Sequence, residues 1–243
     1  MGKVFVVGIG PGNYENMTVR AVRALEASDT VVGYPVYVAL VKDLCAGKEI
    51  FSTPMTKEAE RCRLALAAAR AGKTVSLVCS GDSGIYGMAA LLYELRGEDP
   101  IPEIEPVPGL TAACSGGALL GAPLTHDFAV ISLSDRLTPW ETIETRLRCA
   151  AGADLTIALY NPASHGRPEH LRRACGILLR VLPAERPCGI VRNIGRDGES
   201  RRVLTLGELQ NADADMFCTV FIGNSSARVL DGLLVTPRGY RDV

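Results

Sequence analysis

The segment 74–96 constrains the fold of this chain more than any other. Residues 74–79 are a short, β-rich apolar run that follows a Gly72-Lys73 break, which is typical of a parallel strand covered on both faces. Small residues come next, and the composition then predicts a helix over 84–96. A strand, a small-residue turn and a helix put the turn at the carboxyl edge of an open sheet, where α/β proteins bind ligands. The unit therefore favours a small-molecule site over a scaffold.

Strands and helices alternate through the first half of the chain. This alternation predicts an α/β fold with a parallel-rich sheet and helices on both faces. The expected strands are 4–8, 30–32, 74–79 and 103–107, and the expected helices are 18–28, 57–71, 84–96 and 110–120. Residues 121–125, Gly-Ala-Pro-Leu-Thr, interrupt the pattern and are the candidate linker.

The second half has strand patterns that are less regularly separated by helices, which predicts a mixed sheet. The expected strands are 128–132, 155–160, 188–192, 201–205 and 217–222, and the expected helices are 139–150 and 169–181. We therefore expect two α/β lobes of ordinary domain size, an N-terminal lobe over 1–121 and a C-terminal lobe over 122–243.

Composition excludes several classes of protein. A net charge of −1 and a pI near 6.3 argue against a general nucleic-acid surface. No apolar run approaches the ~18–20 residues that cross a bilayer, and no signal peptide precedes the first strand, so a cytoplasmic protein is expected. The eight cysteines are scattered without a Cys-x-x-Cys pair. They predict reduced, mostly buried thiols and no metal site.

Small-residue turns follow three of the expected strands. Gly8-Ile9-Gly10-Pro11-Gly12 lacks the third glycine of a dinucleotide fingerprint, because Asn13 stands there. Gly81-Asp82-Ser83-Gly84 resembles a serine-protease motif, but all three histidines follow Ser83. Pro108-Gly109-Leu110-Thr111-Ala112 opens a small-residue helix, for which tight helix packing is the alternative interpretation. Together the turns predict a cleft of backbone amides and one carboxylate, which suits an uncharged or zwitterionic cofactor.

These three turns resemble those of the tetrapyrrole methyltransferase family. The branch that methylates precorrin-3B at C17 is similar in further motifs, namely 81–88, His126-Asp127-Phe128, 131–135, 137–141, 158–164, Val191-Arg192-Asn193, Gly195-Arg196, 222–225 and 236–240. Ser83 stands where the family usually has proline, and Thr111 where the branch often has serine. Neither change removes a group that the chemistry needs.

The resemblance implies two α/β lobes of non-Rossmann type with S-adenosylmethionine folded between them. It implies C17 methylation of precorrin-3B, or of its cobalt counterpart, with ring contraction to precorrin-4 in cobalamin biosynthesis by a homodimer. A methyltransferase for another precorrin carbon and a non-catalytic tetrapyrrole carrier are the alternatives. The implied cofactor residues are Pro11, Ser80, Gly81, Asp82, Ile85, Thr111, Ala112, Tyr160, Asn193 and Asn224, and the implied substrate residues are Gly10, Asn161, Arg192, Arg196 and Arg238.

Ring contraction requires proton movement, for which polar residues around one strand are the candidates. They are His126, Asp127, Ser132, Ser134 and Asp135. The alternatives left open are a structural hydrogen bond for His126, a turn-capping role for Asp82 and plain surface roles for the arginines. Trp140 is expected to pack, and His165 and His170 are expected to be solvated.

Overall fold

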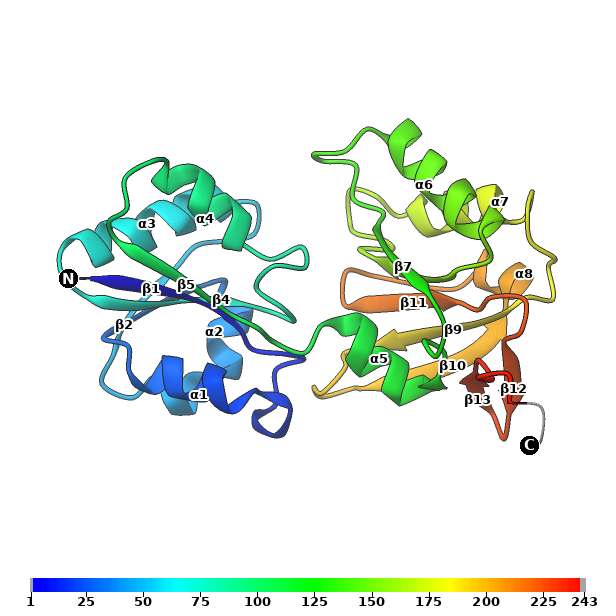
Figure 1. Cartoon of the computed structure of the whole chain (residues 1–243), viewed down its shortest axis with the longest axis horizontal. Helices are drawn as coiled ribbons and strands as arrows, with labels where there is room; N and C mark the ends of the chain where they lie inside the picture. Colours follow the sequence, from blue (N-terminus) through cyan, green and yellow to red (C-terminus); the bar gives the residue numbers. More distant parts are fainter. Residues whose placement is uncertain (1, 241–243) are drawn as a thin grey trace. The chain divides into compact units, whose positions relative to one another are not determined.

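The computed structural model describes residues 2–240. The chain forms two compact units that divide between Ala112 and Ala113 (Figure 1). The lobe boundary that the sequence suggested, after residue 121, stays a prediction. The two units are described in turn.

Unit 1 contains a five-stranded, fully parallel sheet with the order β3-β2-β4-β1-β5. The predicted parallel sheet is thus confirmed, but edge strand β3 was not foreseen because its pattern is short and mostly exposed. The strands are β1 (Lys3–Gly8), β2 (Thr30–Gly33), β3 (Glu49–Ser52), β4 (Thr74–Cys79) and β5 (Glu103–Val107).

Helices cover both faces of this sheet (Figure 1). Successive side chains of a strand point to opposite faces, so Val4 and Val6 pack in the core with α3 and α4, whereas Val7 packs with α1 and α2. The helices are α1 (Val19–Glu26), α2 (Pro35–Leu40), α3 (Glu58–Arg70) and α4 (Ala89–Arg96), with short 3-10 turns η1 (Tyr14–Asn16) and η2 (Lys42–Leu44). Helix α2 was not predicted.

The helix expected from residue 84 begins only at Ala89. Residues 84–88 form a bent segment in which Tyr86 has a φ of +54°. The Asp82 side chain accepts hydrogen bonds from the backbone N–H groups of Gly84 and Ile85. These bonds hold the chain in an Asx turn, and the glycines at 84 and 87 favour irregular backbone over helix.

Unit 2 contains a mixed sheet with the order β10-β9-β11-β8-β7, in which only β7 and β8 pair in parallel. The predicted mixed sheet is therefore confirmed. The elements are α5 (Ala112–Leu120), β7 (Phe128–Ser132), α6 (Trp140–Gly152), β8 (Thr156–Tyr160), α7 (His170–Leu178), β9 (Pro187–Arg192), β10 (Ser200–Thr205), α8 (Leu206–Leu209) and β11 (Cys218–Ile222). Helices α6, α7 and α8 pack on one face, and α5 packs on the other.

A small three-stranded sheet, β12-β13-β6, completes unit 2. It joins β12 (Arg228–Leu230) and β13 (Leu233–Val235) to β6 (Gly121–Ala122). The expected linker thus supplies a strand, and the Pro123 carbonyl accepts hydrogen bonds from the Thr156 and Thr236 hydroxyls. Within residues 2–240, no helix is long and apolar enough to cross a membrane.

Candidate functional site

The three glycine turns of unit 1 meet at one edge of the parallel sheet, because β4, β1 and β5 are neighbours. Gly10 and Gly81 exchange two backbone hydrogen bonds of 3.0 and 2.8 Å. Gly109 lies so close that a Cβ on it would sit 2.1 Å from the Gly81 oxygen. Only glycine fits there, so the backbones of the three turns are in direct contact.

Asp82 ties two of these turns together. Its Oδ1 accepts from the N–H groups of Gly84 at 2.8 Å and Ile85 at 3.0 Å, and its Oδ2 accepts from Gly109 N–H at 3.0 Å. The turn-capping role that sequence reasoning left open is therefore present. An ionised carboxylate can accept about four hydrogen bonds, so Asp82 retains capacity for a ligand, and its part in cofactor binding stays a prediction.

The predicted cofactor residues of unit 1 lie in these turns or directly beside them. Ile85 is exposed, whereas Thr111, within the third turn, is buried. The structure brings together Gly10, Pro11, Ser80, Gly81, Asp82, Ile85, Thr111 and Ala112.

Arg61 is a buried residue beside this edge that sequence reasoning missed. Its side chain donates to the Thr53 hydroxyl and carbonyl, to the Pro54 carbonyl and to the Met88 sulfur. It makes no ion pair with any residue in the described part of the chain. The guanidinium thus anchors the end of the bent 84–88 segment. Arg61 directly precedes Cys62 and falls on the buried face of α3. An arginine at such a position was the sequence signal that could have identified it.

In unit 2, the strand register places the predicted residues at the two ends of the strands, which form opposite edges of the mixed sheet. Ser132 pairs with Tyr160, and β11 runs antiparallel to β8, so Cys218 and its partner Arg192 lie at the same edge. The first edge carries Ser132, Ser134, Asp135, Tyr160, Asn161, Arg192, Asn193 and Arg196, and the second carries His126, Asp127, Asn224 and Arg238.

This separation divides two of the predicted groups. His126 and Asp127 precede β7, whereas the other three candidates for proton movement lie at its far end, so the five residues frame one strand. Asn224 likewise lies across the sheet from Tyr160. His126 Nε2 lies 3.0 Å from the Pro237 carbonyl, the structural hydrogen bond that was its alternative interpretation. Asn224 Oδ1 accepts from both the backbone and the hydroxyl of Ser226.

At the first edge, the three polar residues at and after the end of β7 are close together and have polar neighbours. Ser132 Oγ accepts from Asn161 Nδ2 at 2.9 Å and from Ser134 N–H at 3.2 Å. Arg167 donates to Ser134 Oγ and lies 3.6 Å from Asp135 Oδ1. Sequence reasoning named neither Arg167 nor His170 here.

His170 is 6% exposed, so the expectation that it is solvated was wrong. Its ring packs against Trp140 at a tilt of 52°, with 4.8 Å between centroids, and Nε2 lies 3.5 Å from Asp135 Oδ2. The apolar residues at helical spacing after it, Ala174 and Ile177, were the signal that this face of α7 is buried.

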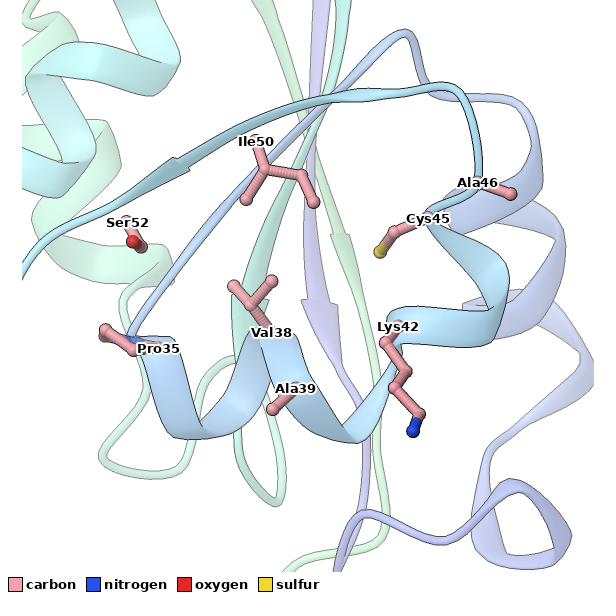
Figure 2. Close-up of a pocket in the computed structure, with 8 residues that line it drawn as sticks. All are labelled: Pro35, Val38, Ala39, Lys42, Cys45, Ala46, Ile50 and Ser52. Atoms are coloured by element: carbon pink, nitrogen blue, oxygen red, sulfur yellow. The ribbon is translucent and has the colours of Figure 1, made fainter.

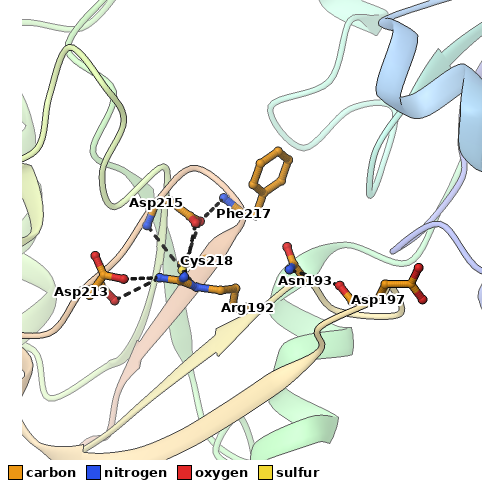
Figure 3. A network of polar contacts seen from close by, with 7 residues as sticks. All are labelled: Arg192, Asn193, Asp197, Asp213, Asp215, Phe217 and Cys218. Carbon is orange, nitrogen blue, oxygen red and sulfur yellow. Dashed lines mark hydrogen bonds and ion pairs between the residues drawn. The ribbon is translucent and has the colours of Figure 1, made fainter.

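Arg192 is already paired with carboxylates (Figure 3). Its guanidinium lies 2.8 Å from Asp213 and 3.6 Å from Asp215, and Nε donates to Cys218 Sγ. The hydrogen bond to Asp213 raises the pKa of Arg192 above its ordinary value. A neutralised cation receives a substrate carboxylate less readily. The expected role of Arg192 in substrate binding stays a prediction.

Tyr160 and Asn193 also have internal partners at this edge. The Tyr160 hydroxyl accepts from Ala113 N–H at 2.6 Å, at the start of α5. Asn193 has a φ of +51°, and its side chain donates to the Asp197 carbonyl at 3.3 Å (Figure 3). Both groups therefore help to shape the loops around them, and their part in cofactor binding stays a prediction.

A separate shallow pocket of about 320 Å³ lies beside α2 and η2 and is lined largely by apolar groups (Figure 2). It contains none of the predicted site residues: its lining is Pro35, Val38, Ala39, Lys42, Cys45, Ala46, Ile50 and Ser52. Between residues 2 and 240, no group of three or more histidine, cysteine or acidic side chains is arranged to hold a metal ion.

The chain is similar to known proteins over nearly its full length. The tetrapyrrole (corrin/porphyrin) methylases match residues 3–210. A probable cobalt-factor III C(17)-methyltransferase of Salmonella typhimurium is 47% identical, with 97% of this chain and 98% of that protein aligned. A precorrin-3B C(17)-methyltransferase of a Sinorhizobium species is 40% identical, with 98% and 97% aligned. The cobalt-factor III methyltransferase of Priestia megaterium is 44% identical over 99% of this chain, which spans only 45% of that longer protein.

Solved structures agree with this relationship. The methyltransferase CobJ superposes with a TM-score of 0.90 at 36% identity, with 98% of this chain and 100% of that chain covered. A Thermus thermophilus uroporphyrin-III C-methyl transferase, solved with S-adenosyl homocysteine, shares the fold with a TM-score of 0.73 at 24% identity, covering 91% and 97%. This chain therefore belongs to the tetrapyrrole (corrin/porphyrin) methylase family, as its glycine turns and later motifs predicted.

Proposed function

We propose that this chain transfers a methyl group from S-adenosylmethionine to C17 of precorrin-3B, or of its cobalt counterpart, in cobalamin biosynthesis. The observation that carries this proposal is 47% identity, over 97% of the chain, to a relative named for C17 methylation of cobalt-factor III. The 36% identical CobJ structure supports it. Contraction of the macrocycle to precorrin-4 is part of the proposal and rests on the family resemblance.

The glycine turns of unit 1 suit the cofactor. Side chains are excluded at Gly8 and Gly109, so the three turns pack backbone against backbone at one place, and Asp82 provides a carboxylate there for a hydroxyl or amino group. S-adenosylmethionine, when bound, supplies an electrophilic methyl group. Pro11, Ser80, Ile85, Thr111 and Ala112 would surround it, with Tyr160, Asn193 and Asn224 as the proposed contributors from unit 2. The main task of these residues is to hold the reactants in line, since displacement at a sulfonium gains most from positioning.

The macrocycle carries many carboxylates, for which Arg196 and Arg238 are the proposed partners along with Gly10 and Asn161. Arg192 has weaker support because Asp213 and Asp215 already neutralise it. For proton movement, Ser132, Ser134 and Asp135 have the stronger support because they lie together. His126 and Asp127, at the other edge of the sheet, would act elsewhere on the substrate.

The test is methyl transfer from methyl-labelled S-adenosylmethionine, run in parallel on trimethylated precorrin and on its cobalt form. We expect label at C17 by NMR of the product. Label at another carbon would replace C17 by a different precorrin position. Tight tetrapyrrole binding with no label incorporated would favour a non-catalytic carrier instead.

A homodimer and a cytoplasmic location are further parts of the proposal. The family resemblance supports the first, and the second rests on the expectation drawn from the sequence. Light scattering during gel filtration measures the assembly: a mass of one chain, 25.9 kDa, would contradict the dimer.

A further inference from the structure

We propose that Asp135 and His170 form a proton-accepting pair for the methyl transfer, with Asp135 facing the substrate and His170 storing the proton behind it. This inference rests on the proposed function. It adds two residues to those that act in the reaction: the buried His170, and Arg167, which lies beside Asp135.

Charge balance creates the need for such a pair. The methyl carbon loses its bond to sulfur and gains a bond to the ring carbon, and sulfur keeps the electron pair of the broken bond as a neutral thioether. The macrocycle therefore gains one positive charge. It returns to its former charge when one N–H bond of the ring system breaks, its electron pair stays on the ring and the proton leaves. A positioned base accelerates such a step by about 10²–10⁴-fold.

The surroundings of His170 define which ring nitrogen can accept. Nδ1 lies 2.9 Å from the Leu133 carbonyl oxygen, and a carbonyl only accepts, so Nδ1 carries the hydrogen. In the neutral ring Nε2 then presents a lone pair, and it lies 3.5 Å from Asp135 Oδ2. The contact with Trp140 fixes the plane of the ring. This histidine is therefore oriented as a base toward Asp135.

The two side chains differ in access to ligands. The Asp135 side chain is 36% exposed and that of His170 only 8%, so a substrate can reach the carboxylate but not the imidazole. A proton taken by Asp135 can pass to Nε2 once the two atoms close to ordinary hydrogen-bond length, about 2.7–2.9 Å. His170 is accordingly a positioning and storage residue that acts through Asp135.

Arg167 holds the carboxylate in place. It lies 3.6 Å from Asp135 Oδ1, the oxygen that does not face His170, and it is itself bonded to Ser134 Oγ and Ser164 Oγ. The guanidinium therefore holds the carboxylate with Oδ2 toward His170. Once the proton has moved to His170, the same carboxylate stands between two cations.

The first test reads the proton directly and needs no substrate. The chain has three histidines, so ¹⁵N NMR of imidazole-labelled protein gives three sets of ring signals. We expect His170 to show a hydrogen on Nδ1 and none on Nε2 in its neutral state, and Asp135→Asn to shift the Nε2 signal. A hydrogen on Nε2 of the neutral ring, or an Nε2 signal that Asp135→Asn leaves unchanged, would overturn the pair.

The second test measures single-turnover methyl transfer with the full-length chain. In His170→Asn the amide can still donate to the Leu133 carbonyl but offers no base to Asp135. We expect a fall of roughly 10²-fold in rate with unchanged affinity for S-adenosylmethionine, and a wild-type rate for the exposed control His165→Asn. An unchanged rate in His170→Asn rules the pair out.

Asp135→Asn is a second variant, since this exposed side chain lies outside the core. It should show the same fall in rate even if His170→Asn folds poorly, and a wild-type rate in it would overturn the proposal. If the wild-type chain itself forms no methylated product, the proposed function fails, whereas the NMR test of the pair still gives its own answer.

Discussion

At the residue scale, Asp82 shows how one side chain can serve both folding and binding. It accepts three backbone N–H groups from two turns. Asp82→Ala leaves these donors without their partner, so we expect the free energy of unfolding to fall by about 1–3 kcal/mol. Urea unfolding measures this. The control Asp99→Ala removes a surface aspartate that accepts one backbone N–H, from Ile101, and lies 3.6 Å from Arg70 in an exposed ion pair. Its free energy of unfolding should fall by clearly less, and equal losses would contradict the joining role.

The cofactor role of Asp82 predicts a separate effect. If its remaining lone pairs bond the ligand, Asp82→Ala should weaken S-adenosylmethionine binding by about 1–3 kcal/mol in calorimetry under conditions where the variant is folded. Unchanged affinity would remove Asp82 from the cofactor residues, yet it would leave the structural role intact.

Single residues were predictable from the sequence where local backbone chemistry defines them. The glycine turns could be recognised in the sequence because runs of small residues at strand ends are typical of tight turns. The partners of a side chain were not predictable: Arg192 meets Asp213, 21 positions away, only because β9 and β11 pair. The burial of His170 likewise depends on Trp140, which another helix brings to it.

At the element scale, helix α5 depends on small residues for its packing. A Cβ on Gly116 would lie 2.9 Å from Val191 Cγ2 and 3.1 Å from both Ile194 Cδ1 and Phe221 Cε2. We expect Gly116→Ala to lower the free energy of unfolding by about 1–3 kcal/mol through overpacking. The same substitution at Gly152, the last residue of α6, meets nothing within 4 Å and should stabilise by about 0.4–1 kcal/mol. Thermal unfolding of both variants decides the matter, and a neutral Gly116→Ala would mean that α5 can move away.

Long, regular elements were also predictable, whereas short ones and edges were not. Strands β1, β4 and β8 and helix α3 follow from apolar periodicity. Helix α2 spans only six residues and β3 only four, which is too short for a clear period. Pairing order was equally out of reach, and it decides which edge of the unit 2 sheet carries each candidate residue.

At the scale of the whole molecule, the buried thiols of both units make the stability of the chain depend on pH. Six of the eight cysteines are buried and all are free, in agreement with the expected role of small hydrophobes. Burial raises the pKa of Cys62 to about 11, and that of Cys79 and Cys175 to about 12. It also raises the pKa of Cys45, Cys188 and Cys218.

These shifts predict that stability falls in alkaline solution. Above the ordinary thiol value of 9.0, the unfolded chain loses thiol protons that the folded chain keeps, so the unfolded state binds fewer protons and the free energy of unfolding decreases as pH rises. Between pH 8 and pH 10 the decrease should be roughly 1 kcal/mol for each strongly shifted thiol, measured by urea unfolding under reducing conditions. Cys175→Ala should lose packing energy at every pH but show a shallower decrease, whereas the exposed control Cys149→Ala should keep the wild-type slope. Identical slopes in the two variants would mean that the buried thiols do not govern the alkaline limit.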